Sequence, residues 1–274
     1  MSNRDFAQSH DGLRIRYEVR GAGEPLALIM GFSGSGRAWG EPFLSRLEKR
    51  FRLVVIDNRG TGESDQPDRS WTLGDMASDV ARVLYRARID RAHIYGISMG
   101  GMIAQEFALA YPSRTRGLVL GCTNCGMKNG VQAAPEVVGA LMPSPDLSPE
   151  EQARRAFSVA CGKAFIGSKA GQDFLTSMMM EMANYPLTPM HTYFRQFEAI
   201  SAFDSFLRLG QIASPTLVIH GDDDALVPHP NAEILAKGIR GAKLHIIKGA
   251  GHMFFWEAVD EAVRVPGDFL DTAK

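Results

Sequence analysis

The sequence predicts an α/β protein with a mostly parallel, twisted sheet flanked by helices, and with further helices inserted after the sixth strand. Short, solidly apolar runs recur along the 274 residues, which is typical of strands covered on both faces. Helical patterns separate these runs, and regular alternation of strand and helix favours a parallel sheet. The alternation stops after Leu120 and resumes at Pro215, so the intervening helices interrupt the sheet sequence.

The first part of the chain contains most of the predicted strands. Residues 12–19 alternate apolar and polar side chains, and a glycine-rich turn then leads into the apolar run 25–30; we interpret them as an amphipathic edge hairpin feeding a buried strand. Buried strands follow, and helices alternate with them. The strands are expected at 53–56, 93–95 and 117–120, and the helices at 73–84 and 102–109.

A helical insert, residues 123–209, separates two parts of the sheet. Helical spacing at 151–160 and 173–183, broken by prolines, predicts several short helices, and strands resume at 216–219 and 244–247. We therefore expect a first core part (1–122), the helical insert acting as a cap (123–209), and a second core part (210–274). The cap is expected to select substrates without supplying an essential catalytic group.

Charge and composition exclude several classes of function. The 30 basic and 31 acidic side chains nearly balance, so no nucleic-acid or anionic-lipid surface is predicted. No run approaches the roughly 18 apolar residues of a membrane span, and the start lacks a signal-peptide core. We expect a cytoplasmic monomer or homodimer. Three cysteines cannot all pair within the chain, and Cys122-x-x-Cys125 lacks the further ligands that zinc requires, so no metal is expected.

The stretch Gly96-Ile97-Ser98-Met99-Gly100 carries the clearest functional signal. It lies between a predicted strand and a predicted helix, which is the context of a nucleophile elbow. Glycines two residues to either side allow the strand and the helix to approach closely. Ser98 is therefore the candidate nucleophile.

A serine nucleophile needs an imidazole base and a carboxylate that orients it. In open parallel sheets, functional groups gather at the carboxyl ends of strands. His252 follows the last predicted strand in a glycine-rich loop, and three consecutive aspartates, Asp222, Asp223 and Asp224, follow the strand before it. Of these we favour Asp224 as the acid, with Asp222 as the alternative.

Acyl transfer also requires donors for the developing oxyanion. The backbone N–H of Met99 comes with the elbow, and the glycine-rich loop after the strand 25–30 contributes the N–H of Phe32. Substrate contacts are expected from both residues and from three further side chains, although a methionine-rich helix such as the segment around 179 more often packs against its neighbours than lines a cavity. These three are Met179, Leu226 and Met253.

Five motifs in this order resemble the α/β-hydrolase superfamily over essentially the whole chain. They are Gly31-Phe32, residues 57–64, residues 96–101, the run 220–228 of the form H-G-x-x-D-x-x-V-P, and residues 249–252. The resemblance implies a Ser-His-Asp triad with Asp224 as acid, and it is strongest to small capped bacterial esterases and enol-lactonases. Met30 departs from the family pattern, since many members carry a histidine there.

The resulting hypothesis is a serine hydrolase that cleaves a small or medium apolar carboxylic ester or lactone through an acyl-enzyme, without a cofactor. A carbon–carbon bond hydrolase or a cofactor-free perhydrolase or haloperoxidase on the same fold is the alternative. A non-catalytic ligand receptor is the third reading, because a fold alone does not determine a function.

Overall fold

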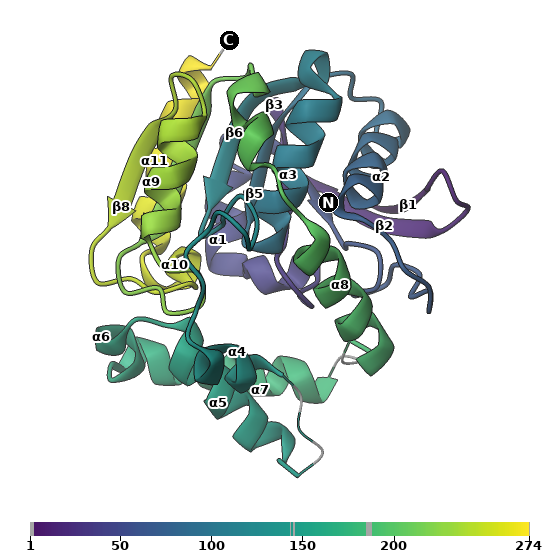
Figure 1. Cartoon of the computed structure of the whole chain (residues 1–274). Helices are drawn as coiled ribbons and strands as arrows, with labels where there is room; N and C mark the ends of the chain where they lie inside the picture. Colours follow the sequence, from purple (N-terminus) through teal and green to yellow (C-terminus); the bar gives the residue numbers. More distant parts are fainter. Residues whose placement is uncertain (1–2, 143, 145, 185–187, 274) are drawn as a thin grey trace.

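A computed structural model describes residues 3–142, 144, 146–184 and 188–273. Its centre is an eight-stranded sheet of order β1-β2-β4-β3-β5-β6-β7-β8, in which β2 runs antiparallel to both of its neighbours and the other neighbouring pairs are parallel (Figure 1). The predicted mostly parallel sheet is confirmed. The strands are β1 (Asn3–Gln8), β2 (Arg14–Arg20), β3 (Glu24–Ile29), β4 (Phe51–Ile56), β5 (Ala92–Ile97), β6 (Thr115–Gly121), β7 (Thr216–Gly221) and β8 (Lys243–Ile247).

The N-terminal edge differs from the expected hairpin. β2 pairs with β1 and β4, and it does not pair with β3. The edge strand is β1, which the sequence analysis did not identify. In β1 only Ala7 is buried among the residues whose burial is described, and an edge strand with so little apolar content carries no recognisable alternation.

Helices cover both faces of the sheet because successive strand residues point to opposite sides. In β3, Ala27 and Ile29 belong to the apolar cluster that also contains residues of α2, α3 and α9, whereas Leu26 and Leu28 belong to the cluster that contains residues of α1, α10 and α11. These helices are α1 (Glu41–Leu47), α2 (Leu73–Arg86), α3 (Met99–Ala110), α9 (Pro230–Gly238), α10 (Phe254–Glu257) and α11 (Val259–Thr272), with short 3-10 turns at Gly36–Trp39, Pro112–Arg114 and Phe206–Gln211.

In the described part of the insert, five α-helices lie between β6 and β7. They are α4 (Pro135–Leu141), α5 (Pro149–Ala160), α6 (Lys163–Ile166), α7 (Lys169–Asn184) and α8 (Met190–Ala202). Helices α4–α7 group together beside α10, while α8 returns along the core (Figure 1). Phe157, Phe174 and Leu175 form a small apolar cluster of the insert, against which Met253 and Trp256 of the core pack.

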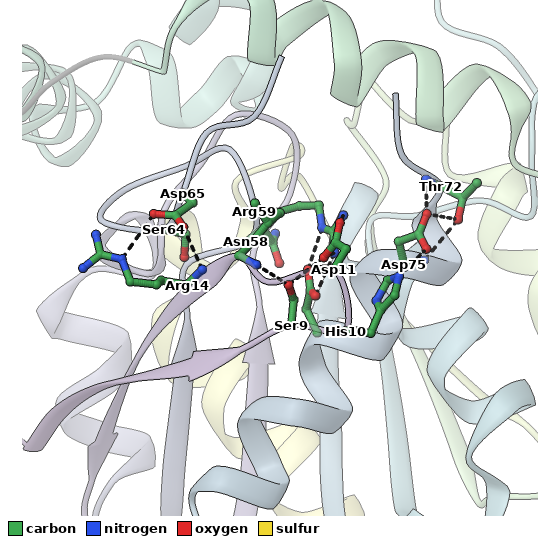
Figure 2. Close-up of polar contacts among 12 residues, drawn as sticks. Ser9, His10, Asp11, Arg14, Asn58, Arg59, Ser64, Asp65, Thr72 and Asp75 are labelled. Carbon is green, nitrogen blue, oxygen red and sulfur yellow. Dashed lines mark hydrogen bonds and ion pairs between the residues drawn. The ribbon is translucent and has the colours of Figure 1, made fainter. Parts of the chain in front are cut away.

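A buried ion-pair network ties the N-terminal strands to the loop after β4 (Figure 2). Arg59 is 1% exposed and bonds Asp79 of α2 through two nitrogens, at 2.7 and 2.8 Å. Nη1 of Arg59 donates to Asp11 at 3.2 Å, and Nη2, which also bonds Asp79, donates to Asp11 at 3.3 Å. A planar guanidinium suits such forked contacts better than an ammonium group. This network holds the loop 57–65 on which α8 packs.

Among the helices of the described residues, none combines the length and the apolar character needed to cross a bilayer.

Candidate active site

Ser98 occupies the junction between β5 and α3, where the chain turns sharply from strand to helix. Its backbone has φ 55° and ψ −126°, a conformation that non-glycine residues rarely adopt. A Cβ at Gly96 would lie 2.1 Å from the carbonyl oxygen of Gly100, and a Cβ at Gly100 would lie 2.1 Å from that of Ile29. Both positions therefore require glycine. The turn leaves Ser98 half-buried at the carboxyl end of the sheet.

Asp224 follows β7, and both oxygens of its buried carboxylate are hydrogen-bonded. Oδ1 accepts the backbone N–H groups of Leu226 and Val227, each at 2.9 Å. Oδ2 lies 2.8 Å from Nδ1 of His252 and 3.2 Å from Nε2 of His220. Burial opposes ionisation, but the two imidazoles lower the pKa of Asp224 to about 2. The carboxylate is therefore an ionised acceptor at neutral pH.

The other two aspartates of the run serve different partners. Asp222 accepts the N–H of Gly249 at 2.6 Å and pairs with Lys248 at 3.1 Å. Asp223 accepts the N–H of Lys163, the first residue of α6, at 2.7 Å. Neither carboxylate is bonded to His252, so of the three it is Asp224 that the structure brings to the imidazole.

His252 is 9% exposed and lies in the loop between β8 and α10. Because an ionised Asp224 can only accept, Nδ1 of His252 carries a proton, and Nε2 is the ring nitrogen that does not bond Asp224. Burial favours the neutral ring, but the Asp224 carboxylate raises the pKa of His252 above its usual 6.5. Among the described hydrogen bonds, none joins the Ser98 hydroxyl to this ring.

The two candidate oxyanion donors border Ser98. Within the described residues, neither the N–H of Met99 nor that of Phe32 has a hydrogen-bond acceptor. A Cβ at Gly31 would lie 2.9 Å from Cβ of Ser98, which places the loop after β3 directly against the serine. Two unpaired backbone donors beside an elbow serine match the arrangement that stabilises a tetrahedral oxyanion.

The expected substrate-contacting side chains differ in their surroundings. Phe32 is half-buried, with its ring 5.1 Å from that of Tyr193 in α8. Met179 and Met253 are half-buried against the apolar cluster of the insert. Leu226 is half-buried beside Asp224. The Met99 side chain is 1% exposed and packs inside the core, so Met99 is left with its backbone N–H as the group available to a substrate.

Two residues beside the triad candidates were not identified from the sequence. His220 ends the strand run before the aspartates, and its Nε2 also donates to the Val227 carbonyl at 2.7 Å. Cys122 is completely buried, and its Sγ, an Asp224 oxygen and a His252 nitrogen all lie within 4.8 Å of one another. Burial raises the pKa of the Cys122 thiol. Cys122 follows β6, which lies between β5 and β7 in the sheet, so its place beside Asp224 and His252 depends on a strand order that the sequence alone does not give.

Two groups among the described residues each bring three potential metal-ligating side chains together. The first is Cys122, Asp224 and His252, and the second is His10, Asp11 and Asp79. In the first, Asp224 and His252 already bond each other. In the second, both carboxylates bond Arg59, whose positive charge opposes a cation at that place.

The sheet, with helices on both faces and a strand-to-helix serine turn, defines the architecture of an α/β enzyme. The model of the α/β-hydrolase fold family matches residues 24–259. The chain belongs to the α/β-hydrolase family, and its relatives support a hydrolase activity.

Three similar proteins illustrate the range of this family. A putative carbamate hydrolase, RutD, of Azorhizobium caulinodans is 31% identical, with 88% of each chain covered. Est816, an N-acyl homoserine lactone degrading enzyme, is 28% identical, with a TM-score of 0.80, over 97% of this chain and 100% of Est816. The esterase RhEst1 from Rhodococcus sp. ECU1013 is 26% identical, with a TM-score of 0.84 and 99% of each chain covered.

Proposed function

We propose that this protein is a serine hydrolase of a small or medium apolar carboxylic ester or lactone. The observation that carries the proposal is the 2.8 Å contact between Nδ1 of His252 and Oδ2 of Asp224, at the same edge of the sheet as the strained Ser98. A carboxylate that fixes the tautomer of an imidazole beside an elbow serine is the arrangement of acyl-transfer enzymes.

In the proposed reaction, Oγ of Ser98 attacks the substrate carbonyl while Nε2 of His252 takes the hydroxyl proton. The N–H groups of Met99 and Phe32 bind the oxyanion, each contributing about 3–4 kcal/mol to lowering the barrier. The proton then passes to the leaving alcohol, and water hydrolyses the acyl-enzyme by the reverse sequence. Hydrogen bonds of catalytic groups often tighten only with substrate bound, so the serine–imidazole bond is expected to form in the complex.

An activated organophosphonate tests the nucleophile directly. We expect one phosphonyl adduct per chain, on Ser98, together with loss of hydrolysis of 4-nitrophenyl acetate. Ser98→Ala should abolish both the adduct and the hydrolysis. A labelled residue other than Ser98, or full esterase activity in Ser98→Ala, would contradict the proposal.

A second experiment identifies the acyl group and the leaving group of the preferred substrate. Relatives that act on carbamates and lactones share the architecture, and the carbon–carbon hydrolase and perhydrolase alternatives would use the same serine. A panel of 4-nitrophenyl esters, γ- and δ-lactones, an N-alkyl carbamate and a vinylogous 1,5-diketone separates these readings. We expect the highest kcat/KM among the esters and lactones. A preference of more than tenfold for the carbamate or the diketone would replace this substrate class.

A further inference from the structure

The loop that carries Phe32 makes a tight turn over four residues. The N–H of Gly34 bonds the carbonyl of Gly31 at 3.3 Å, which closes the turn Gly31-Phe32-Ser33-Gly34. Ser33 has φ 58°, and a positive φ at the third position of a turn is the mark of type II, where glycine is the usual residue. A serine there needs support from its surroundings.

Both peptide groups of Ser33 are bonded by the helical insert. The N–H of Ser33 donates to Oε1 of Gln196 in α8 at 2.8 Å. The carbonyl of Ser33 accepts the hydroxyl of Thr188, just before α8, also at 2.8 Å. These bonds oppose rotation of the Phe32–Ser33 peptide toward a turn in which Ser33 would have a negative φ.

Gln196 is itself fixed in orientation. Its side chain is completely buried, and Nε2 donates to the carbonyl of Arg59 at 3.3 Å. Because one partner is a donor and the other an acceptor, only this placement of the amide oxygen and nitrogen satisfies both. A Cβ at Gly60 would lie 2.3 Å from Cγ2 of Thr192, so α8 packs directly against the loop that Arg59 anchors.

The core fixes the other end of the turn. Nδ2 of Asn58 donates to the carbonyl of Met30 at 2.8 Å. In a trans peptide the N–H points away from the carbonyl of the same unit. The bond between the carbonyl of Gly31 and Gly34 therefore directs the N–H of Phe32 out of the turn. The peptide groups around Phe32 are thus held by the core on one side and by the insert on the other.

We infer that Gln196 and Thr188 are positioning residues that hold the Ser33 peptide and so keep the N–H of Phe32 aimed at the oxyanion. The inference rests on the proposed acyl transfer at Ser98. It extends the role of the insert, because α8 then acts on the rate of the chemical step as well as on the choice of substrate. Neither side chain needs to touch the substrate for this effect.

The test compares Gln196→Leu and Thr188→Val with the wild-type protein. We expect kcat for 4-nitrophenyl acetate and for the butyrate to fall by about 10- to 100-fold, less than for removal of a donor itself, with KM changed less than threefold. Phosphonylation of Ser98 should slow by a similar factor, because its transition state also places an oxyanion against Phe32. Thr188→Ser keeps the hydroxyl that donates to the Ser33 carbonyl and should lose less activity than Thr188→Val.

Two matched controls remove similar bonds inside the insert. Gln152 bonds backbone groups around α4, and Thr176 bonds the carbonyl of Gln172 within α7. Gln152→Leu and Thr176→Val should therefore leave kcat on acetate and the phosphonylation rate within about threefold of wild type.

Three outcomes would overturn the inference. The first is a kcat and a phosphonylation rate equal to those of the wild type in folded Gln196→Leu and Thr188→Val. The second is an effect confined to KM, or a loss of activity on the butyrate alone, which would indicate a pocket contact. If Gln196→Leu fails to fold, Thr188→Val decides, since Thr188 is half-buried. The third is wild-type protein that neither hydrolyses esters nor labels at Ser98, which would reject the proposed function and this inference together. If the wild type is phosphonylated at Ser98 and Gln196→Leu and Thr188→Val react at the same rate, the inference is rejected and the proposed function stands.

Discussion

The sheet core and the helical insert support the same candidate site in different ways. The core positions Ser98 and Asp224 through close backbone approaches and a fully bonded carboxylate. The insert instead bonds backbone groups of two core loops. Ala160 accepts the N–H of Met253 at 3.0 Å, beside His252, and Gln196 accepts that of Ser33. This difference indicates that the core positions the reacting side chains, while the insert holds the backbone of the loops around them.

The largest expected effect separates the three aspartates of the core. Asp224→Asn should lower kcat by about 10⁴-fold, because an amide favours the wrong tautomer of His252 and does not stabilise the imidazolium. Asp222→Asn and Asp223→Asn should stay within about threefold of wild type, since their partners are backbone groups and lysines. Steady-state kinetics on 4-nitrophenyl acetate measures all three. A severe loss in Asp222→Asn instead would move the acid to that residue.

Truncating one phenylalanine in each region tests whether the two regions unfold together. Phe107 is completely buried in the core and Phe157 is 4% exposed in the insert. Phe107→Ala should lower the global free energy of unfolding by about 3–5 kcal/mol. Phe157→Ala should mainly speed hydrogen exchange in α5 and α7 through local opening. Equal acceleration of exchange in β5 and α5 by Phe157→Ala would show that the regions are one cooperative unit.

Acid should destabilise the core through His93 of β5. Burial lowers the pKa of His93 from 6.5 to about 4, so the unfolded chain binds a proton that the folded chain does not between these pH values. Stability is then lost as pH falls from about 6.5 toward 4, by about 2 kcal/mol at pH 5.

His93→Phe removes this sensitivity. Denaturant unfolding at pH 7 and pH 5 should show a smaller difference for His93→Phe than for wild type, while the surface control His10→Asn should keep the wild-type difference. An unchanged difference in His93→Phe would assign the acid sensitivity to other groups.

The smallest effect concerns substrate choice by the insert. Met179→Ala should shift the preference between the octanoate and the acetate ester by about 1 kcal/mol in total, the size of one methylene contact in a pocket, with hydrolysis of the acetate preserved. The ratio of kcat/KM values measures this shift. A uniform loss on both esters in folded protein would mean that Met179 acts on the reaction itself, and an unchanged ratio would leave it as a packing residue.

Most strands of the sheet could be predicted from the sequence, because seven of them contain apolar runs or a clear alternation of apolar and polar residues. The sequence analysis missed β1, whose residues with described burial include one buried side chain, Ala7. It placed Ser98, Asp224 and His252 at strand ends that the fold brings to one edge of the sheet. It could not reveal Cys122 and Gln196 beside this edge, because their partners are set by strand order and by packing between distant segments.

The separation of β6 from β7 along the chain has a consequence for the order of folding. The two strands are neighbours in the sheet, yet β6 ends at Gly121 and β7 begins at Thr216. Closing a flexible loop of that length costs about 2 kcal/mol more than closing one of ten residues. Early collapse of the apolar cluster around Phe157 would shorten the effective loop. Asp224 and His252 reach Ser98 only when β7 and β8 dock, so we expect refolding chains to gain most of their helix and sheet before they gain the complete site.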